Sequence, residues 1–204
     1  MHEPARFLGA VRMAARLHGK QTRKGNGSPY LYHLLGVAAL VGEYGGDEDA
    51  VIAALLHDAA EDQGGQDTLL VIAGEFGWAV HDIVKACSDS LGPKGAVKAP
   101  WIDRKREYVQ LADTKPLPAQ LVSLADKTHN AESTAADLAT HGAAVWDRFR
   151  GGYAGMVWYW DGLLAAYGRS GVCPPLLRRF AAAVARCKAL TEASDPAALL
   201  AHRH

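Results

Sequence analysis

Apolar residues recur at the spacing of helical turns along most of the chain, and no window alternates apolar and polar positions over the length of a strand. This pattern predicts an all-α protein. In the first half of the chain it predicts helices at Ala5–His18, Tyr32–Tyr44, Asp47–Asp62, Thr68–Phe76, Trp78–Ser88 and Asp103–Ala112. In the second half it predicts helices at Ala119–Leu138, Met156–Tyr167 and Pro175–Thr191.

Glycine pairs separate several of these helices, and their freedom to take positive φ predicts turns rather than phosphate-binding loops. The pairs are Gly45-Gly46, Gly64-Gly65 and Gly151-Gly152. The stretch with linker-like composition, Leu91–Pro100 (LGPKGAVKAP), is short enough to be an ordinary connection between helices. With no internal repeat, residues 1–204 are expected to form a single domain, with a core at about residues 5–140 and a helical C-terminal part at about residues 141–204.

Composition and charge exclude several classes of protein. Lys and Arg together number 22, as do Asp and Glu, so the chain has no net field that would attract a long polyanion such as DNA. A small phosphorylated ligand needs only a local basic cluster and is not excluded. No apolar stretch approaches the ~20 residues of a membrane span, and the cysteines form no Cys-x-x-Cys pair. We therefore expect a cytoplasmic protein whose partner is neither nucleic acid nor a membrane.

The strongest chemical signal lies in Ala50–Asp62 (AVIAALLHDAAED), where an apolar half-helix runs into the ionisable residues His57, Asp58, Glu61 and Asp62. In a continuous helix these four would fall within about 140° of one face and could converge on one point. The adjacent imidazole and carboxylate suit a metal ion, and the carboxylates one turn later suit the handling of water. A polar helix end is the alternative, but so many polar groups directly after an apolar run would be costly to bury without partners.

Other polar and aromatic clusters are interpreted as ordinary structure. The second His-Asp pair, His81-Asp82, has no acidic residues one turn later and is interpreted as a solvated helix face. The basic run Arg104-Lys105-Arg106 could reach a phosphate, but it is interpreted in the same way. The aromatic residues of Trp146-Asp147-Arg148-Phe149 and Val157-Trp158-Tyr159-Trp160 are expected to pack in the core rather than to stack on a ligand.

Further metal ligands would have to come from elsewhere in the chain. His33 opens an apolar helix, and Asp126 interrupts an apolar helical stretch. Each alone could be a hydrogen-bonded residue of the core, but together with His57-Asp58 they favour ligation. Two imidazoles and two carboxylates suit a first-row divalent ion, and the share of oxygen favours Mn²⁺ over structural zinc. Asn130 lies one turn after Asp126, so both are expected to point the same way.

Three segments carry a resemblance to a known family. They are Gln21-Thr22-Arg23-Lys24 with Pro29-Tyr30-Leu31-Tyr32-His33, then Ala53-Ala54-Leu55-Leu56-His57-Asp58-Ala59-Ala60-Glu61-Asp62, then Leu124-Ala125-Asp126-Lys127-Thr128-His129-Asn130. In this order they resemble the HD-domain phosphohydrolases, and within them the alarmone hydrolases of the Rel/Spo type and their small stand-alone relatives. The resemblance spans about residues 5–130 and implies an HD-domain helical bundle.

The resemblance implies a role for each matching residue. One Mn²⁺, or another divalent ion, would be bound by His33, His57, Asp58 and Asp126. The other implied roles are activation of water by Glu61 and Asp62, contact with substrate phosphates by Arg23 and Lys24, and contact with the nucleotide by Asn130. The implied reaction removes the 3′-pyrophosphate from guanosine tetra- or pentaphosphate and gives GDP or GTP.

Departures from the family pattern leave two alternatives open. Leu34 stands where proline is common, Gln63 stands where threonine is common, and the aromatic last third is closer to a branch of small bacterial HD proteins whose substrate these motifs do not settle. One alternative is therefore an HD phosphohydrolase acting on another nucleotide, such as NADPH or a nucleoside phosphate. The other is a nucleotide-binding regulator without turnover, which would not require Glu61 and Asp62.

Overall fold

The computed structural model describes residues 4–25, 27–92 and 97–194. Its α-helices are α1 (Pro4–His18), α2 (Tyr30–Glu43), α3 (Glu48–Leu56), α4 (Ala59–Gln63), α5 (Gly65–Phe76), α6 (Trp78–Cys87), α7 (Trp101–Leu111), α8 (Leu117–His141), α9 (Gly152–Ser170) and α10 (Pro174–Ser194). A 3₁₀ helix, η1 (Gly142–Arg148), joins α8 to α9. Within the described ranges the β pairing is limited to an isolated bridge between Thr22 and Pro29, so the predicted all-α class is confirmed.

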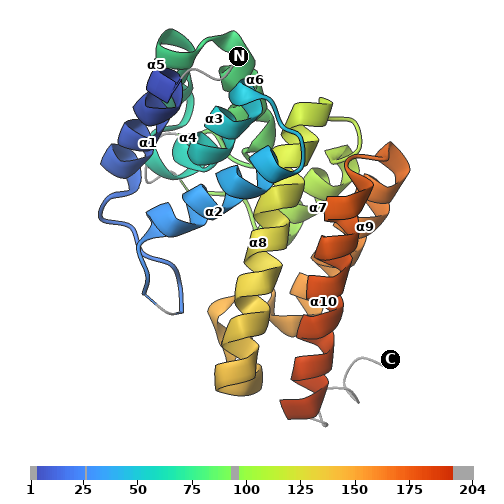
Figure 1. The fold of residues 1–204 in the computed structure, drawn as a ribbon. Coiled ribbons are helices and arrows are strands. Elements are labelled where there is room, and N and C mark those ends of the chain that lie inside the picture. The colour runs from blue at the N-terminus through green and yellow to red at the C-terminus, as the bar shows by residue number, and fades with distance from the viewer. Residues whose placement is uncertain (1–3, 26, 93–96, 195–204) are drawn as a thin grey trace.

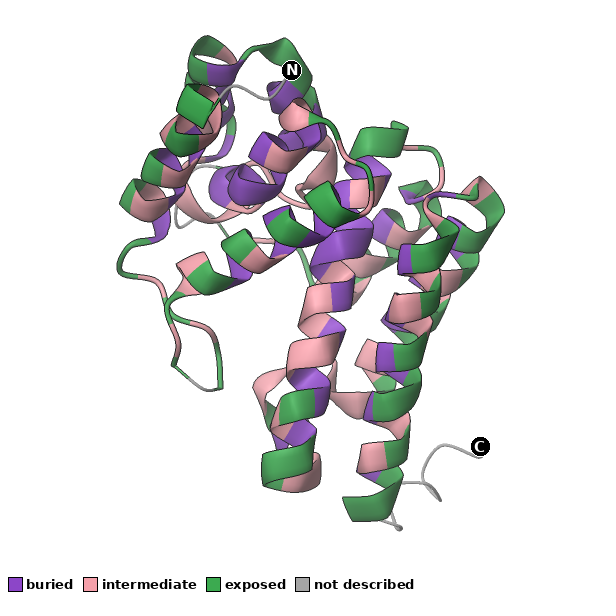
Figure 2. Cartoon of the chain, viewed as in Figure 1, coloured by how far each residue is buried: buried purple, intermediate pink, exposed green. Residues whose placement is uncertain are grey.

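The long helix α8 lies between two groups of helices (Figure 1). On one side, α2, α3 and α6 pack against it, and α1 and α5 lie outside them. On the other side, α10 runs beside α8, and α9 packs against α7 and α10. Exposed residues lie on the outer sides of the helices and buried residues between them (Figure 2). An element that reaches the middle of this arrangement is therefore covered by neighbours in every direction.

The first half of α8 is covered in this way. Proline in the first turn is compatible with the start of a helix, and the helix ends at Gly142, whose φ is 63°. The five residues from Val122 to Asp126 are all buried. Because consecutive helical side chains point about 100° apart, five buried residues in a row require neighbours on all sides. The carboxylate of Asp126 is thus placed in the interior of the protein.

The helix predicted over Asp47–Asp62 is wrong in one respect, because the structure bends it at His57-Asp58 into α3 and α4. Asp47 caps α3 by accepting a hydrogen bond from the backbone N–H of Ala50 at 2.8 Å. The burial of Ile52 to Leu56 anchors α3 in the core. The four ionisable residues therefore do not share one helix face. Instead, His57 and Asp58 lie at the bend, and the two later carboxylates follow on a separate short helix.

The other predicted helices are present, several of them a few residues longer than expected. Each predicted glycine turn contains one residue with positive φ, namely Gly45 at 87°, Gly65 at 58° and Gly152 at 56°. The 3₁₀ helix η1 was not predicted, because its short turns carry no 3.6-residue periodicity. Residues 93–96 of the linker-like segment lie outside the described residues.

The C-terminal aromatic residues pack in the core as predicted, with one exception. Trp146, Tyr159 and Trp160 are buried, and the Nε1–H of Trp146 donates to Thr191 Oγ1 at 2.9 Å. Trp158 is the exception, with 40% of its surface exposed. None of the helices in the described part of the chain combines the length and the apolar character needed to cross a bilayer.

Candidate metal centre

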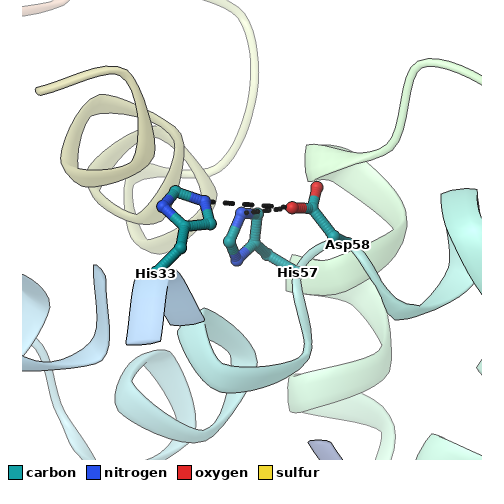
Figure 3. Close-up of side chains that lie close together, drawn as sticks. All are labelled: His33, His57 and Asp58. Carbon is teal, nitrogen blue, oxygen red and sulfur yellow. Dashed lines mark ion pairs between the residues drawn. The ribbon is translucent and has the colours of Figure 1, made fainter. Parts of the chain in front are cut away.

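Two histidines and an aspartate meet where α2 approaches the bend between α3 and α4 (Figure 3). His33 lies near the start of α2, and His57 and Asp58 form the bend. One potential ligand atom from each residue lies within 4.8 Å of the others. Both imidazoles are almost fully buried, with exposed fractions of 1% for His33 and 3% for His57. The bend thus turns the two adjacent side chains toward α2.

Asp126 brings a second carboxylate to the same point from α8. Its Oδ1 lies 3.2 Å from Nε2 of His33 and 3.6 Å from Nε2 of His57. The carboxylate of Asp58 also lies beside His57, with its Oδ2 at 3.1 Å from Nε2 of that ring. The structure therefore brings together all four residues that the sequence analysis singled out as ligands, from three segments far apart in the chain.

The Nε2 atoms of His33 and His57 are buried and make no hydrogen bond of acceptable geometry within the described residues. Each ring uses its other nitrogen for support: Nδ1 of His57 donates to the carbonyl of Ala54 at 2.7 Å, and Nδ1 of His33 lies 3.1 Å from Nδ1 of His129. An imidazole supported at Nδ1 presents a lone pair at Nε2, which is how metal-ligating histidines are arranged. Two such lone pairs facing two carboxylates fit a divalent metal ion.

Both carboxylates are held in the charged form that ligation requires. Burial alone would raise the pKa of Asp58, but the neighbouring His57 outweighs burial and lowers that pKa. For Asp126 burial is likewise outweighed, chiefly by the charge of Lys127, and the pKa lies well below its ordinary value. Burial would lower the pKa of His57, but the same two carboxylates outweigh it and raise that pKa well above its ordinary value. Binding of a cation would therefore release a proton from His57 but none from the acids.

Further side chains hold these ligands, and the sequence analysis did not assign them this role. Lys127 Nζ donates to Oδ2 of Asp126 at 2.5 Å, which leaves Oδ1 facing the imidazoles. The hydroxyl of Tyr30 donates to Oδ2 of Asp58 at 2.5 Å. Tyr30 lies one turn before His33 on α2, and this spacing is the signal that could have identified it.

The predicted substrate-binding residues are only partly brought together. Arg23 donates from Nη1 to Oδ1 of Asn130 at 2.9 Å, and Asn130 in turn donates to Asp126 Oδ1 at 2.5 Å. The predicted common direction of Asp126 and Asn130 is therefore present. Lys24 is exposed on the same loop as Arg23, and within the described residues only Arg23 of the two contacts another candidate residue.

Glu61 and Asp62 lie on α4 and are held by different neighbours. Glu61 accepts from Lys98 Nζ at 2.8 Å and from the backbone N–H of Asp89 at 3.4 Å. Burial and the charge of Asp89 raise the pKa of Glu61 despite the opposing contact with Lys98. Asp62 Oδ2 accepts from the side-chain amide of Gln21 at 2.9 Å. A carboxyl group with a raised pKa is a stronger proton acceptor than an ordinary glutamate and can also return the proton.

Asp89 connects Glu61 to α7 and corrects the interpretation of the basic run. Its side chain is only 4% exposed and accepts from Arg104 Nη1 at 2.5 Å and from Lys105 Nζ at 2.7 Å. Arg104 and Lys105 therefore do not form a solvated face, because each turns inward to the same buried carboxylate. Of the three basic residues, Arg106 alone matches the prediction, with its side chain 61% exposed.

Asp89→Asn is expected to lower the free energy of unfolding by about 3 kcal/mol at neutral pH, because two partly buried cations would lose their carboxylate. Burial raises the pKa of Asp89, but Lys105 and Arg104 outweigh it and hold the folded-state pKa at about 2. A folded-state pKa below the unfolded one gives stability that is present above about pH 4 and disappears as the pH falls toward 2. Denaturant unfolding at pH 7 and pH 3 should therefore show a smaller difference between wild type and variant at the lower pH.

Asp103→Asn is the matched control for this measurement. Asp103 also pairs with an arginine of α7, but the pair is exposed, at 57% for Asp103 and 61% for Arg106. Its removal should change the free energy of unfolding by no more than about 0.5 kcal/mol. Equal effects of the two substitutions would show that the Asp89 contacts do not stabilise the fold.

His81-Asp82 corrects a second interpretation. Asp82 is exposed as predicted. His81, however, is buried, with 5% of its surface exposed, and its Nδ1 lies 2.8 Å from Oδ1 of Asp82. The ring also meets Trp78 edge to face, with centroids 4.9 Å apart. The solvated-face interpretation is therefore wrong for the imidazole. Among the described residues, the group of potential metal ligands consists of His33, His57 and Asp58 and does not include this pair.

The fold and the site define a metal-dependent phosphohydrolase: an all-α protein with a buried pair of imidazoles, two charged carboxylates and an acid of raised pKa. The sequence model of the family described as "HD domain" matches residues 10–156. The chain therefore belongs to the HD-domain family, as its motifs predicted. Members of this family use a divalent metal ion, and the His-His-Asp cluster provides the residues for one.

Two named relatives resemble this chain over about 60% of its length. It is 38% identical over 131 residues to the human protein named guanosine-3′,5′-bis(diphosphate) 3′-pyrophosphohydrolase MESH1, across 63% of this chain and 69% of that protein. It is 36% identical over 120 residues to a Haemophilus influenzae protein named guanosine-3′,5′-bis(diphosphate) 3′-pyrophosphohydrolase, across 58% of this chain and 17% of that protein.

Solved structures share the fold over more of the chain. A protein described as a metazoan ortholog of SpoT that hydrolyses ppGpp superposes with a TM-score of 0.72 at 24% identity, covering 93% of this chain and 99% of that one. The Listeria monocytogenes protein lmo0812 superposes with a TM-score of 0.64 at 28% identity, covering 78% of this chain and 99% of that one. The likeness in fold thus extends beyond the region of recognisable sequence identity.

Proposed function

We propose that this protein is a Mn²⁺-dependent guanosine-3′,5′-bis(diphosphate) 3′-pyrophosphohydrolase, which converts ppGpp and water to GDP and pyrophosphate. The observation that carries the proposal is the buried set of four donor residues together with an acid of raised pKa. The two Nε2 atoms of this set face carboxylates but make no hydrogen bond within the described residues. The substrate follows from the relatives, two of which are named for this reaction and match the chain at 38% and 36% identity.

His33, His57, Asp58 and Asp126 would hold the metal ion. The set offers two nitrogens and two charged oxygens, a mixture that suits Mn²⁺ better than a structural zinc ion, for which thiolates are preferred. When bound, a divalent ion supplies Lewis-acid activation of water and of a phosphoryl oxygen. The remaining chemistry falls to side chains of this chain.

Glu61 is the candidate base. Its raised pKa suits it to take a proton from the attacking water, whose oxygen forms a bond to the phosphorus attached to the ribose 3′ oxygen. The bond from that phosphorus to the 3′ oxygen breaks, and the 3′ oxygen leaves with a proton returned by the acid. Asp62, held by Gln21, would orient the water. Arg23, held beside Asn130, would contact the phosphates of the substrate.

The direct test is product release from purified nucleotides in the presence of Mn²⁺. We expect GDP and pyrophosphate from ppGpp, with kcat/KM higher than for NADPH or simple nucleoside phosphates. Cleavage of another nucleotide but not of ppGpp would overturn the substrate and leave the hydrolase. Binding of ppGpp without release of product from any nucleotide would instead identify a regulator.

Arg23→Ala should lower kcat/KM for ppGpp by about tenfold or more, which corresponds to the ~1.5–3 kcal/mol of a charge-assisted hydrogen bond. The variant should keep the metal content of wild type, because Arg23 contacts Asn130 and not a metal-ligating atom. Lys20→Ala is the control, since Lys20 is an exposed cation that precedes the same loop. Similar losses in both variants would indicate a general effect of charge and remove Arg23 from the substrate site.

A further inference from the structure

The two histidines of the metal centre are supported by different kinds of partner. His57 Nδ1 donates to the backbone carbonyl of Ala54, a group that any residue at that position would supply. His33 Nδ1 lies instead 3.1 Å from Nδ1 of His129, and the two rings meet edge to face with centroids 4.9 Å apart and an interplanar angle of 65°. The polar support of His33 Nδ1 therefore comes from one particular side chain.

A hydrogen bond between two imidazoles determines where both protons lie. For Nε2 of His33 to present its lone pair beside Asp126, the proton of His33 must be on Nδ1. That N–H then donates to Nδ1 of His129, which must carry a lone pair, so the proton of neutral His129 is on its own Nε2. The contact thus favours the tautomer of His33 that can bind a cation.

Gly36 provides the space in which His129 makes this contact. It lies one turn after His33 on α2, where glycine is a poor helix former. A Cβ atom at Gly36 would lie 2.4 Å from Nε2 and 2.5 Å from Cδ2 of His129. Neither distance is compatible with the present position of the ring. α2 therefore supplies both the supported histidine and the space for its support.

We propose that His129 is a positioning residue that holds His33 in its metal-binding tautomer and orientation, and that Gly36 admits it. The proposal rests on His33 being a metal ligand in the proposed function. In the described structure, His129 makes a hydrogen bond to His33 and to none of the other candidate ligands. The proposal predicts that His129 nevertheless affects the affinity of the centre for a divalent ion.

Titration calorimetry of the full chain with Mn²⁺ alone tests this without nucleotide or turnover. His129→Phe should weaken Mn²⁺ binding by about tenfold to a hundredfold, the range typical of lost support for a metal ligand. His129→Asn should stay within about threefold of wild type, because the amide oxygen lies near the place of Nδ1 and can accept from His33. Gly36→Ala should weaken binding in the same direction as His129→Phe, although it removes no polar atom.

Gly74→Ala is the matched control for the glycine substitution. Gly74 also lies inside a helix, α5, but nothing lies within 4 Å of a Cβ atom added there, so its Mn²⁺ affinity should equal that of wild type. Circular dichroism of each variant reports whether it is folded; if His129→Phe is not, the Gly36→Ala and His129→Asn measurements decide.

Wild-type Mn²⁺ affinity in folded His129→Phe would overturn the inference. An equal loss of Mn²⁺ affinity in His129→Asn and His129→Phe would also overturn it, because the shape of the ring and not its hydrogen bond would then matter. Absence of Mn²⁺ binding by the wild-type protein would overturn the metal assignment itself, and this outcome is distinct from both.

Discussion

His57→Ala is expected to weaken the binding of a divalent ion by about a hundredfold or more, so that the purified variant retains little of the metal found in wild type. The substitution removes one of two buried Nε2 lone pairs that face Asp126 at 3.2 and 3.6 Å. Asp126→Ala should have the same effect, because Lys127 would then keep its charge next to the imidazoles with no carboxylate between. Elemental analysis after dialysis against Mn²⁺ measures both.

His81→Ala is a close control for this experiment. His81 is also buried, also precedes an aspartate and also contacts it through the ring, but it lies outside the cluster of donor residues. Its removal should cost stability and leave the metal content unchanged. A loss of metal in His81→Ala equal to that in His57→Ala would mean that the measurement reports folding rather than ligation. Unchanged metal content in both ligand variants would refute the centre.

Glu61→Gln should keep the fold and the bound metal but reduce kcat by about 10²–10⁴-fold, the usual contribution of a positioned proton acceptor. Glutamine preserves the shape of the side chain, and its amide oxygen can still accept from Lys98. Because the pKa of Glu61 is raised, wild-type activity should increase with pH through that pKa, and this rise should be absent in the variant. The measurement is a pH profile of kcat at saturating Mn²⁺.

Glu107→Gln controls for the loss of a glutamate, since Glu107 is exposed on α7 and should be kinetically silent. Full activity of Glu61→Gln would assign Glu61 a structural role, in which it serves mainly as the partner of Lys98. Failure of the variant to fold would also count against its role as the base.

The sequence predicted the helices and the candidate ligands because both depend on local patterns. An aspartate inside an apolar helical stretch, such as Asp126, has to be paired or ligated, and this can be read without knowing its partner. The bend at His57-Asp58 could not be predicted, because the apolar periodicity continues through it. The two helices pack chiefly against different partners, α3 against α2 and α4 against α5, and the local sequence does not contain this information.

Contacts between distant segments account for the errors and omissions. Like His57, His81 is followed in the sequence by an aspartate. Whether a histidine is buried depends on which helices cover it, and the His-Asp dipeptide contains no such information. The inward turn of Arg104 and Lys105 depends on Asp89, which is 15 and 16 residues away. Gly36 was not singled out, because the reason for a glycine there is a ring on α8.

The position of α8 has a consequence for how such proteins diverge. One side of this helix carries Asp126, and another side packs against α10, where Cys187 Sγ lies 3.3 Å from the carbonyl of Ala131. The likeness in fold to the SpoT ortholog covers 93% of the chain, whereas the sequence model of the HD-domain family ends at residue 156, near the start of α9. We therefore expect evolution to preserve volume and apolar character in α9 and α10 while exchanging the residues themselves, so that homologues with unrecognisable C-terminal sequences retain the same support behind their ligands.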